Sequence, residues 1–192
     1  FGEQRSAETA AVLVDRSHRA VLALSGAERK TWLHTLCTQH VADLPDGAST
    51  ENLTLDATGH IQNHWVQTER SERTYLDTEP WRGAPLTDHL RKMVFWADVA
   101  IEPADLAVLS LLGPGRDAPA VLEALGLTEP LGATAVPVGD AGGFVRRTPG
   151  HDALELLVPR ADKGEWQRRL TQAGVRTAGI WAYEADRVAA GR

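Results

Sequence analysis

The sequence contains a single cysteine, Cys37, among its 192 residues, which excludes an intrachain disulfide. A chain without disulfides is typical of a reducing compartment, so we expect a cytoplasmic location. Residues 1–5 lack the charged and apolar regions of a secretory signal, and none is expected there. No run of about 18 apolar residues occurs, so we expect no membrane-spanning helix and no membrane partner.

The chain also lacks any run of basic residues, and its formal net charge is −6. Duplex nucleic acid is therefore not an expected partner, because phosphate binding needs clustered Lys and Arg. The seven histidines are scattered, and the pair His60 and His64 has no cluster of Cys or carboxylates beside it, so no metal site is expected. Nucleophile-elbow, phosphate-loop and dinucleotide motifs are absent.

What the chain does contain is a regular alternation of strand and helix patterns, in a composition of 43% hydrophobic and 24% charged residues. Strands are predicted near 12–15, 20–24, 53–55, 61–66 and 73–78, with helices from 25 to 36 and from 86 to 93. The second half repeats this order. Short turns between strands favour antiparallel sheets. We therefore predict an α+β fold with a duplicated antiparallel sheet-and-helix layout, divided into subdomains 1–98 and 99–192.

The stretch 53–65 predicts a β-hairpin, because two alternating strands flank an Asp-Ala-Thr-Gly turn. Within the second strand, Asn63 shares a face with Ile61 and Trp65, where a lone amide needs a hydrogen-bond partner. The partner is either a bound polar heterocycle or a neighbouring backbone group of the sheet. Cys37 lies in an apolar helical pattern, which favours buried packing.

Several segments, taken in order over almost the whole length, resemble the glycine-cleavage T-protein (aminomethyltransferase) superfamily. Within it they resemble the YgfZ-type folate-binding proteins, which are linked to the assembly and repair of iron–sulfur clusters. The resemblance implies the duplicated folate-binding fold, with folate in a central hole between the two halves. The segments that carry it are 14–19, 24–41, 55–59, 111–114 and 179–191.

Three positions depart from the transferase pattern. The transferases have a pair of Asp residues after the hairpin, where this chain has Asn63 and His64. His151 stands where their pterin-binding Glu is expected, and Tyr183 replaces the first Arg of their last helix motif, while Arg187 is kept. A neutral amide cannot hold a charge or relay a proton at neutral pH. These departures argue against aminomethyl transfer.

The resemblance therefore implies a non-catalytic protein that binds tetrahydrofolate or another folate and assists iron–sulfur enzymes as clients. The expected cofactor-binding residues are Asn63, His151, Tyr183 and Arg187, with no catalytic residue. A solvated turn histidine is the alternative for His151. Arg187 is expected to pair with the folate glutamate or with a structural acid such as Glu155.

Two other functions remain open at this point: a folate-dependent aminomethyltransferase and a scaffold without a ligand. In YgfZ-type proteins a Lys-Gly-Cys signature and a small barrel domain follow the last helix. This chain ends before both, so we expect it to be an N-terminal fragment. Four tryptophans are expected either in the core or as aromatic walls of the site. They are Trp65, Trp81, Trp96 and Trp181.

Overall fold

The structure, a computed structural model, describes residues 7–191, so the expectation for residues 1–5 lies outside the described part. The chain forms two compact units. The continuous unit comprises His18–Asp105, and the discontinuous unit comprises Phe1–Ser17 together with Leu106–Arg192. Among the described residues, no helix is both long enough and apolar enough to cross a membrane.

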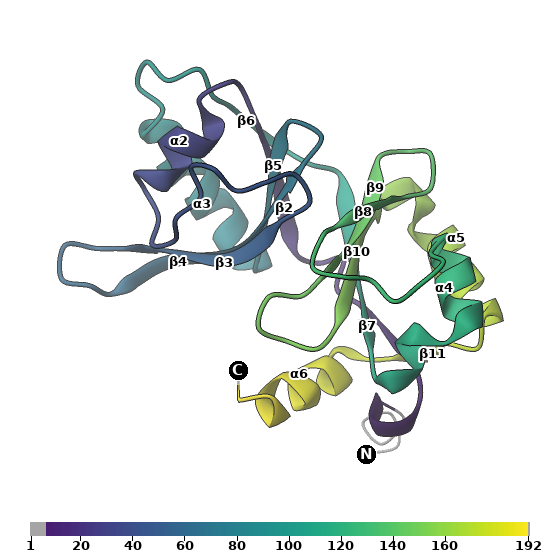
Figure 1. Cartoon of the computed structure of the whole chain (residues 1–192). Coiled ribbons are helices and arrows are strands. Elements are labelled where there is room, and N and C mark those ends of the chain that lie inside the picture. The colour runs from purple at the N-terminus through teal and green to yellow at the C-terminus, as the bar shows by residue number, and fades with distance from the viewer. Residues whose placement is uncertain (1–6, 192) are drawn as a thin grey trace. The chain divides into compact units, whose positions relative to one another are not determined.

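The continuous unit is a five-stranded antiparallel sheet in the order β3-β4-β5-β2-β6, with α2 and α3 against one face (Figure 1). Trp65 and Leu76 project from the sheet into a core that Leu33, Leu86 and Leu90 complete from the helices. The alternation of strand residues places one set on this face. The elements are β2 (Ala20–Ser25), α2 (Arg29–His34), β3 (Ser49–Leu55), β4 (Ile61–Arg70), β5 (Arg73–Thr78), α3 (Pro80–Lys92) and β6 (Ala100–Pro103).

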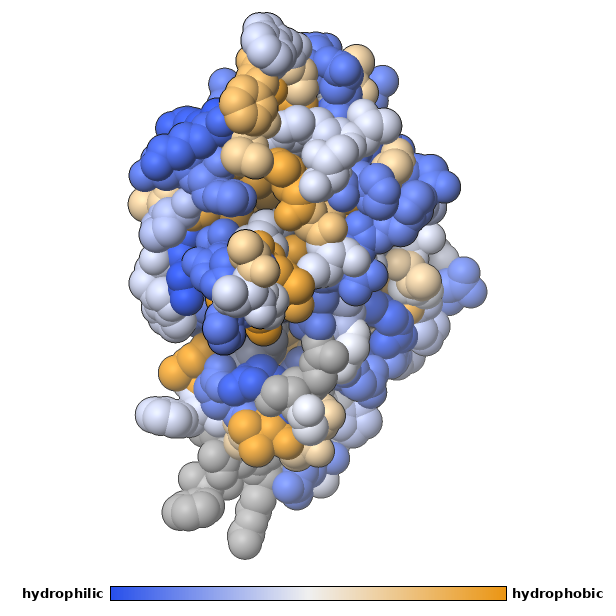
Figure 2. Space-filling view, turned by 90° about the vertical axis from the view of Figure 1, so that its left-hand side faces the viewer, coloured by the Kyte–Doolittle hydropathy of each residue, from blue (hydrophilic) through white to orange (hydrophobic). Residues whose placement is uncertain are grey.

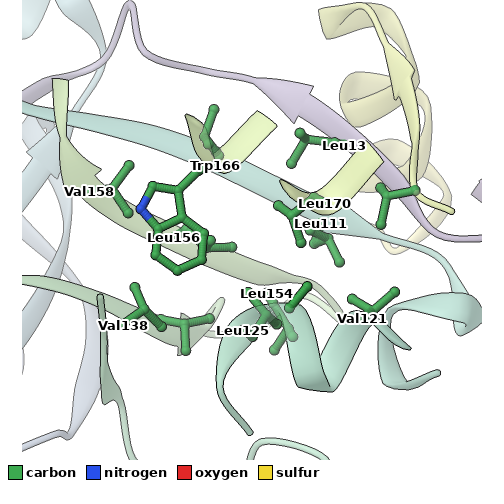
Figure 3. Close-up of a cluster of buried hydrophobic side chains, with 14 of the residues drawn as sticks. Leu13, Leu111, Val121, Leu125, Val138, Leu154, Leu156, Val158, Trp166 and Leu170 are labelled. Atoms are coloured by element: carbon green, nitrogen blue, oxygen red, sulfur yellow. The ribbon is translucent and has the colours of Figure 1, made fainter. Parts of the chain in front are cut away.

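The discontinuous unit is a six-stranded sheet in the order β11-β1-β7-β10-β9-β8, antiparallel except for the pair β1 and β11. Helices α4 and α5 cover one face, where Trp166, Leu170 and Leu125 pack on strand residues such as Leu154 and Leu156 (Figure 3). The elements are β1 (Val12–Asp15), β7 (Leu106–Leu112), η1 (Pro114–Asp117), α4 (Pro119–Leu125), β8 (Val136–Val138), β9 (Gly143–Arg147), β10 (Leu154–Pro159), η2 (Arg160–Asp162), α5 (Lys163–Gln172), β11 (Arg176–Ala178) and α6 (Ile180–Ala189).

The predicted duplicated α+β fold is confirmed. In each unit a strand, a helix, three antiparallel strands and a second helix follow in order: β2-α2-β3-β4-β5-α3 and β7-α4-β8-β9-β10-α5. The place beside β2 is filled by β6, whereas the corresponding place beside β7 is filled by β1. The boundaries therefore differ from the expected ranges 1–98 and 99–192, because the first strand pairs with the second unit.

Two predicted helix starts are wrong. The first helix was expected to begin at Ser25, but α2 begins at Arg29. Gly26 adopts φ +106°, and a Cβ there would lie 2.0 Å from the carbonyl oxygen of Asp98, so only glycine fits. The second helix was expected to begin at residue 86, but α3 begins at Pro80.

The hairpin predicted around Gly59 is present and joins β3 to β4. The Asp56 carboxylate accepts hydrogen bonds from the backbone N–H groups of Thr58 at 2.8 Å and His60 at 2.9 Å. A hydrogen bond from the Thr58 hydroxyl, followed by those from the backbone, lowers the pKa of Asp56 to about 2. This turn fixes the register that aligns Thr54 with Asn63.

Candidate functional site

His151 lies in the turn before β10, where Asp186 of α6 holds one of its ring nitrogens. Its Nε2 lies 2.6 Å from Asp186 Oδ2. An ionised carboxylate only accepts, so this bond places a proton on Nε2. The side chain is 4% exposed, and Nδ1 is buried with no hydrogen-bond partner in the described part of the chain. His151 is therefore an oriented, buried imidazole, and the alternative of a solvated turn histidine does not hold.

Tyr183 packs between His151 and a buried arginine. Its ring meets that of His151 edge-on, with centroids 5.4 Å apart and an interplanar angle of 81°. On the other side the Arg16 guanidinium lies 3.7 Å from the Tyr183 ring centroid. Such cation–π and edge contacts fix the orientation of an aromatic ring. Two predicted site residues, His151 and Tyr183, are thus brought into direct contact.

Behind Tyr183 lies a buried ion cluster that the sequence analysis did not identify. Glu155 of β10 binds Arg16 at 2.6 Å through Oε1 and Arg146 at 2.6 Å through Oε2. The register of the sheet places Glu155 at the centre of this cluster, because Glu155 lies opposite Arg146 on β9 and opposite Ser110 on β7. In the sequence, charged residues at alternate positions of otherwise apolar strands were the feature from which this cluster could have been predicted. A carboxylate between two guanidinium groups rigidifies this face of the sheet.

Arg187 makes an ion pair on its own helix. Its Nη2 lies 2.7 Å from Glu184 Oε2, and both side chains are 39% exposed. Arg187 therefore does pair with a structural acid, as one alternative expected, but the acid is Glu184, whereas Glu155, the example given, binds Arg16 and Arg146. Arg187 and Tyr183 belong to the same helix, but Tyr183 is buried while Arg187 reaches the surface.

Asn63 belongs to the continuous unit, on β4 opposite Thr54 of β3. Its Nδ2 donates to Thr54 Oγ1 at 2.8 Å, and the residue is buried. The expected sheet partner was a backbone group, whereas the observed one is a threonine hydroxyl. One donor of the amide is thus used within the sheet, and the carbonyl oxygen can accept a further contact.

The face of β4 that carries Asn63 continues into a buried polar network. Asn52 donates to Gln67 at 3.3 Å, and Gln67 donates to Glu69 at 3.1 Å. Thr74 also donates to Glu69, at 2.6 Å. Burial raises the pKa of Glu69, although these hydrogen bonds act in the opposite direction. Polar residues at alternating positions of a buried strand were the signal for this network.

Cys37 lies at the edge of the same network. It is partly buried against the core of its unit, and the Asn52 amide lies 3.0 Å from its sulfur. Burial raises the pKa of the Cys37 thiol. The thiol is thus disfavoured as a thiolate nucleophile, in agreement with the packing role expected from the sequence. No group of three or more His, Cys, Asp or Glu suited to a metal occurs within residues 7–191.

Of the four tryptophans considered as core or aromatic walls, only Trp65 is in the core. Trp81, Trp96 and Trp181 are exposed by 68%, 97% and 75%. Apolar residues reach the surface among polar ones on the face drawn in Figure 2. These three tryptophans therefore do not contribute to a hydrophobic core.

Comparison with known proteins gives a consistent result over the full length. The chain superposes on the glycine cleavage system aminomethyltransferase T from Bartonella henselae with a TM-score of 0.88, at 23% identity, covering 100% of this chain and 54% of that one. The chain has the fold of a glycine-cleavage aminomethyltransferase. A weaker likeness, with a TM-score of 0.57 at 16% identity, links it to heterotetrameric sarcosine oxidase from Corynebacterium sp. U-96, covering 90% of this chain and 89% of that one.

Sequence relatives agree with this fold. An aminomethyltransferase of Methylococcus capsulatus is 28% identical over 100% of this chain and 54% of its own length. One from Rubrobacter xylanophilus is 29% identical over 98% of this chain and 53% of its own length. No protein-family model matches. The chain spans about half the length of the curated relatives it matches, and these matches support the resemblance to the glycine-cleavage T-protein superfamily.

Proposed function

We propose that this chain is a tetrahydrofolate-binding module that has the aminomethyltransferase fold but does not carry out aminomethyl transfer. The observation that carries the proposal is the state of Asn63. At the position where the resemblance expects an acid, a buried neutral amide donates to Thr54 at 2.8 Å. Without a charge, this side chain cannot stabilise a developing cation or take up a proton.

The folate contacts that we propose are Asn63, His151, Tyr183 and Arg187. Asn63 offers its carbonyl oxygen as an acceptor, since its N–H₂ group already binds Thr54. His151 and Tyr183 offer a rigid aromatic pair, because Asp186 and Arg16 hold their rings in place. Arg187 offers a guanidinium to the folate carboxylates at a surface-accessible position, in exchange for Glu184.

The YgfZ-type resemblance adds a cellular role, which we propose for the whole protein: assistance to iron–sulfur enzymes in cluster assembly or repair. We expect cells that lack the protein to lose activity of an iron–sulfur enzyme, and the loss to be reversed by the wild-type gene. Enzymes without clusters provide the control. Equal loss in both classes would contradict the role.

A second candidate, an aminomethyltransferase, is favoured by the names of the relatives, each of which is an aminomethyltransferase. It is tested by supplying the chain to a glycine-cleavage reaction and measuring methylene-tetrahydrofolate. Formation above the rate without the chain would support this candidate and contradict binding without transfer.

The binding proposal itself is tested by anaerobic calorimetric titration of the chain with tetrahydrofolate. We expect saturable binding in the micromolar range, weakened at least about tenfold by His151→Leu, which removes the oriented ring. The matched control is His40→Leu, whose ring is 66% exposed and which should bind like the wild type. Circular dichroism verifies that each variant is folded. No binding by the folded wild-type chain would contradict the proposal.

A further inference from the structure

The discontinuous unit contains a cavity of about 430 Å³ between the end of β7, the turn η1 and helix α6. Its polar lining consists of three carboxylates, one guanidinium and one imidazole, and the remaining lining residues are small. The five polar residues are Arg116, Asp117, His151, Asp152 and Asp186. The cavity has the size of a small-molecule site.

The charge of this lining is unbalanced toward the negative. Arg116 is its only guanidinium, and its two terminal nitrogens donate to the Asp152 carboxylate, to the Asp152 carbonyl at 3.0 Å and to the Gly113 carbonyl at 3.2 Å. The hydrogen bond from Arg116 is the main reason that the pKa of Asp152 is lowered. Arg116 thus pairs with Asp152 and also lies 3.8 Å from Asp117, but one guanidinium against three carboxylates leaves the lining negative. A cavity with this charge attracts cations.

Unpartnered buried polar atoms gather at the same place. Of seven such side-chain atoms within residues 7–191, three belong to residues that line the cavity and a fourth to Thr148 in the turn of His151, whereas buried polar atoms normally have a partner. Arg116 and His151 are 8% and 4% exposed at their side chains, so each is more than nine-tenths buried. The four atoms are Arg116 Nε, Asp117 Oδ1, His151 Nδ1 and Thr148 Oγ1.

Three of these four atoms can accept a hydrogen bond. Asp117 Oδ1 and Thr148 Oγ1 carry lone pairs, and His151 Nδ1 carries one in the neutral imidazole because Asp186 fixes the proton on Nε2. Acceptors in excess of donors, in a lining with more carboxylates than guanidinium groups, match a ligand that is both positively charged and rich in N–H groups. A metal ion is a poorer match, since no group of metal-binding side chains occurs in the described residues.

We propose that this cavity binds a small organic cation with a primary or secondary ammonium group, which donates to Asp117 and Asp186. The alanine and glycine lining leaves room for a short aliphatic stem. The proposal shares His151 with the proposed folate contacts, but it goes beyond folate binding and does not depend on it, because its charged contacts are the carboxylates of the cavity and not Asn63, Tyr183 or Arg187.

The test is an NMR titration of the ¹⁵N-labelled chain with ethanolamine hydrochloride at constant ionic strength, in the absence of folate. We expect saturable shifts confined to amides of residues 113, 115–117, 151–152 and 186–190. Asp117→Asn and Asp186→Asn should each weaken binding at least about tenfold, since each removes a charged acceptor. Asp140→Asn, an exposed aspartate in the β8–β9 turn of the same unit, should change nothing.

The proposal would be overturned by shifts that sodium chloride reproduces, by shifts that persist unchanged in both variants, or by no shifts at all. Sodium acetate serves as the anionic probe and should leave these amides unshifted. The spectrum of each variant reports its fold. If Asp186→Asn loses its fold through His151, the result is decided by Asp117→Asn, whose side chain is 30% exposed and makes no bond to His151.

Discussion

The two units bury polar side chains on their sheets in different ways. The discontinuous unit buries formal charges: Glu155 lies between Arg16 and Arg146, and all three are at most 6% exposed. The continuous unit buries one ion pair, Arg19 with Asp77, and beside it a network of neutral amides and hydroxyls that runs from Asn52 through Gln67 to the carboxylate of Glu69.

This difference predicts how the stability of each unit changes when one residue of its buried polar group is removed. Removing one partner from a buried ion cluster leaves an uncompensated charge in a medium of low polarity. Removing one amide from a neutral network leaves unpaired dipoles, which is less costly. The cluster of the discontinuous unit should therefore be the more sensitive of the two, and it is also the one that supports Tyr183 through Arg16.

The largest effect is expected for Glu155→Ala, which leaves the buried Arg16 and Arg146 guanidinium groups without their shared carboxylate. We expect the free energy of unfolding to fall by about 3–5 kcal/mol. Urea denaturation followed by tryptophan fluorescence measures it, with Glu123→Ala, an exposed residue of α4 in the same unit, as the control. A loss equal to that of the control would show that the cluster does not stabilise the unit.

A smaller effect is expected for Gln67→Ala at the centre of the neutral network. The substitution removes the acceptor of Asn52 and a donor to Glu69, and should cost about 1–3 kcal/mol. The same denaturation experiment applies, with Gln172→Ala, which lies at the end of α5 and is exposed, as the control. A cost above that of Glu155→Ala would reverse the comparison between the two units.

The pH dependence of stability in the variant Glu69→Gln tests the role of the buried carboxylate in the neutral network. The folded-state pKa of Glu69 is raised above its ordinary value of 4.5, so the folded state holds the proton more tightly than the unfolded state. Stability from this group is therefore fully present below pH 4.5 and decreases as the pH rises through the folded pKa. The variant should lose this decrease and be at least as stable as the wild type at pH 7. Urea denaturation at a series of pH values measures this dependence. If the free energy of unfolding fell with pH as steeply in the variant as in the wild type, Glu69 would not be the group responsible.

The smallest effect on stability is expected for Arg187→Ala. Its pair with Glu184 is 39% exposed on both sides, and exposed pairs contribute at most about 1 kcal/mol. Tetrahydrofolate affinity should nevertheless fall at least about tenfold if Arg187 binds a folate carboxylate. Lys92→Ala, an exposed cation at the end of α3, is the matched control. Unchanged affinity in both would remove Arg187 from the site.

The sequence predicted the fold well because strand alternation and turn chemistry are local. The Asp-Ala-Thr-Gly turn and the two alternating strands around it set the β3–β4 hairpin without help from the rest of the chain. The unit boundary was missed because β1 pairs with β7, which lies about 90 residues later in the chain, and no local pattern records such a pairing. The start of α2 was predicted wrongly because the backbone of Gly26 packs against the carbonyl group of Asp98, which is distant in the sequence.

The site was only partly predictable, because its contacts also join residues that are distant in the sequence. The sequence identified Asn63, His151, Tyr183 and Arg187 as departures from, or matches to, a family pattern, but it gave no partner for any of them. Asp186, which orients His151, lies 35 residues away, and the ion cluster joins residues of β9 and β10 to Arg16, which follows β1. These partners follow from sheet register and from the docking of α6, which sequence spacing does not encode.

Hydrogen–deuterium exchange with and without tetrahydrofolate tests the central claim most directly. The account predicts slower exchange on folate binding in three segments: the end of β4 that carries Asn63, the turn of His151 and helix α6. Peptides of α4 and α5, on the opposite face of the same sheet as α6, serve as the internal control. Binding that leaves all three segments unchanged, or that protects only the control peptides, would contradict the account.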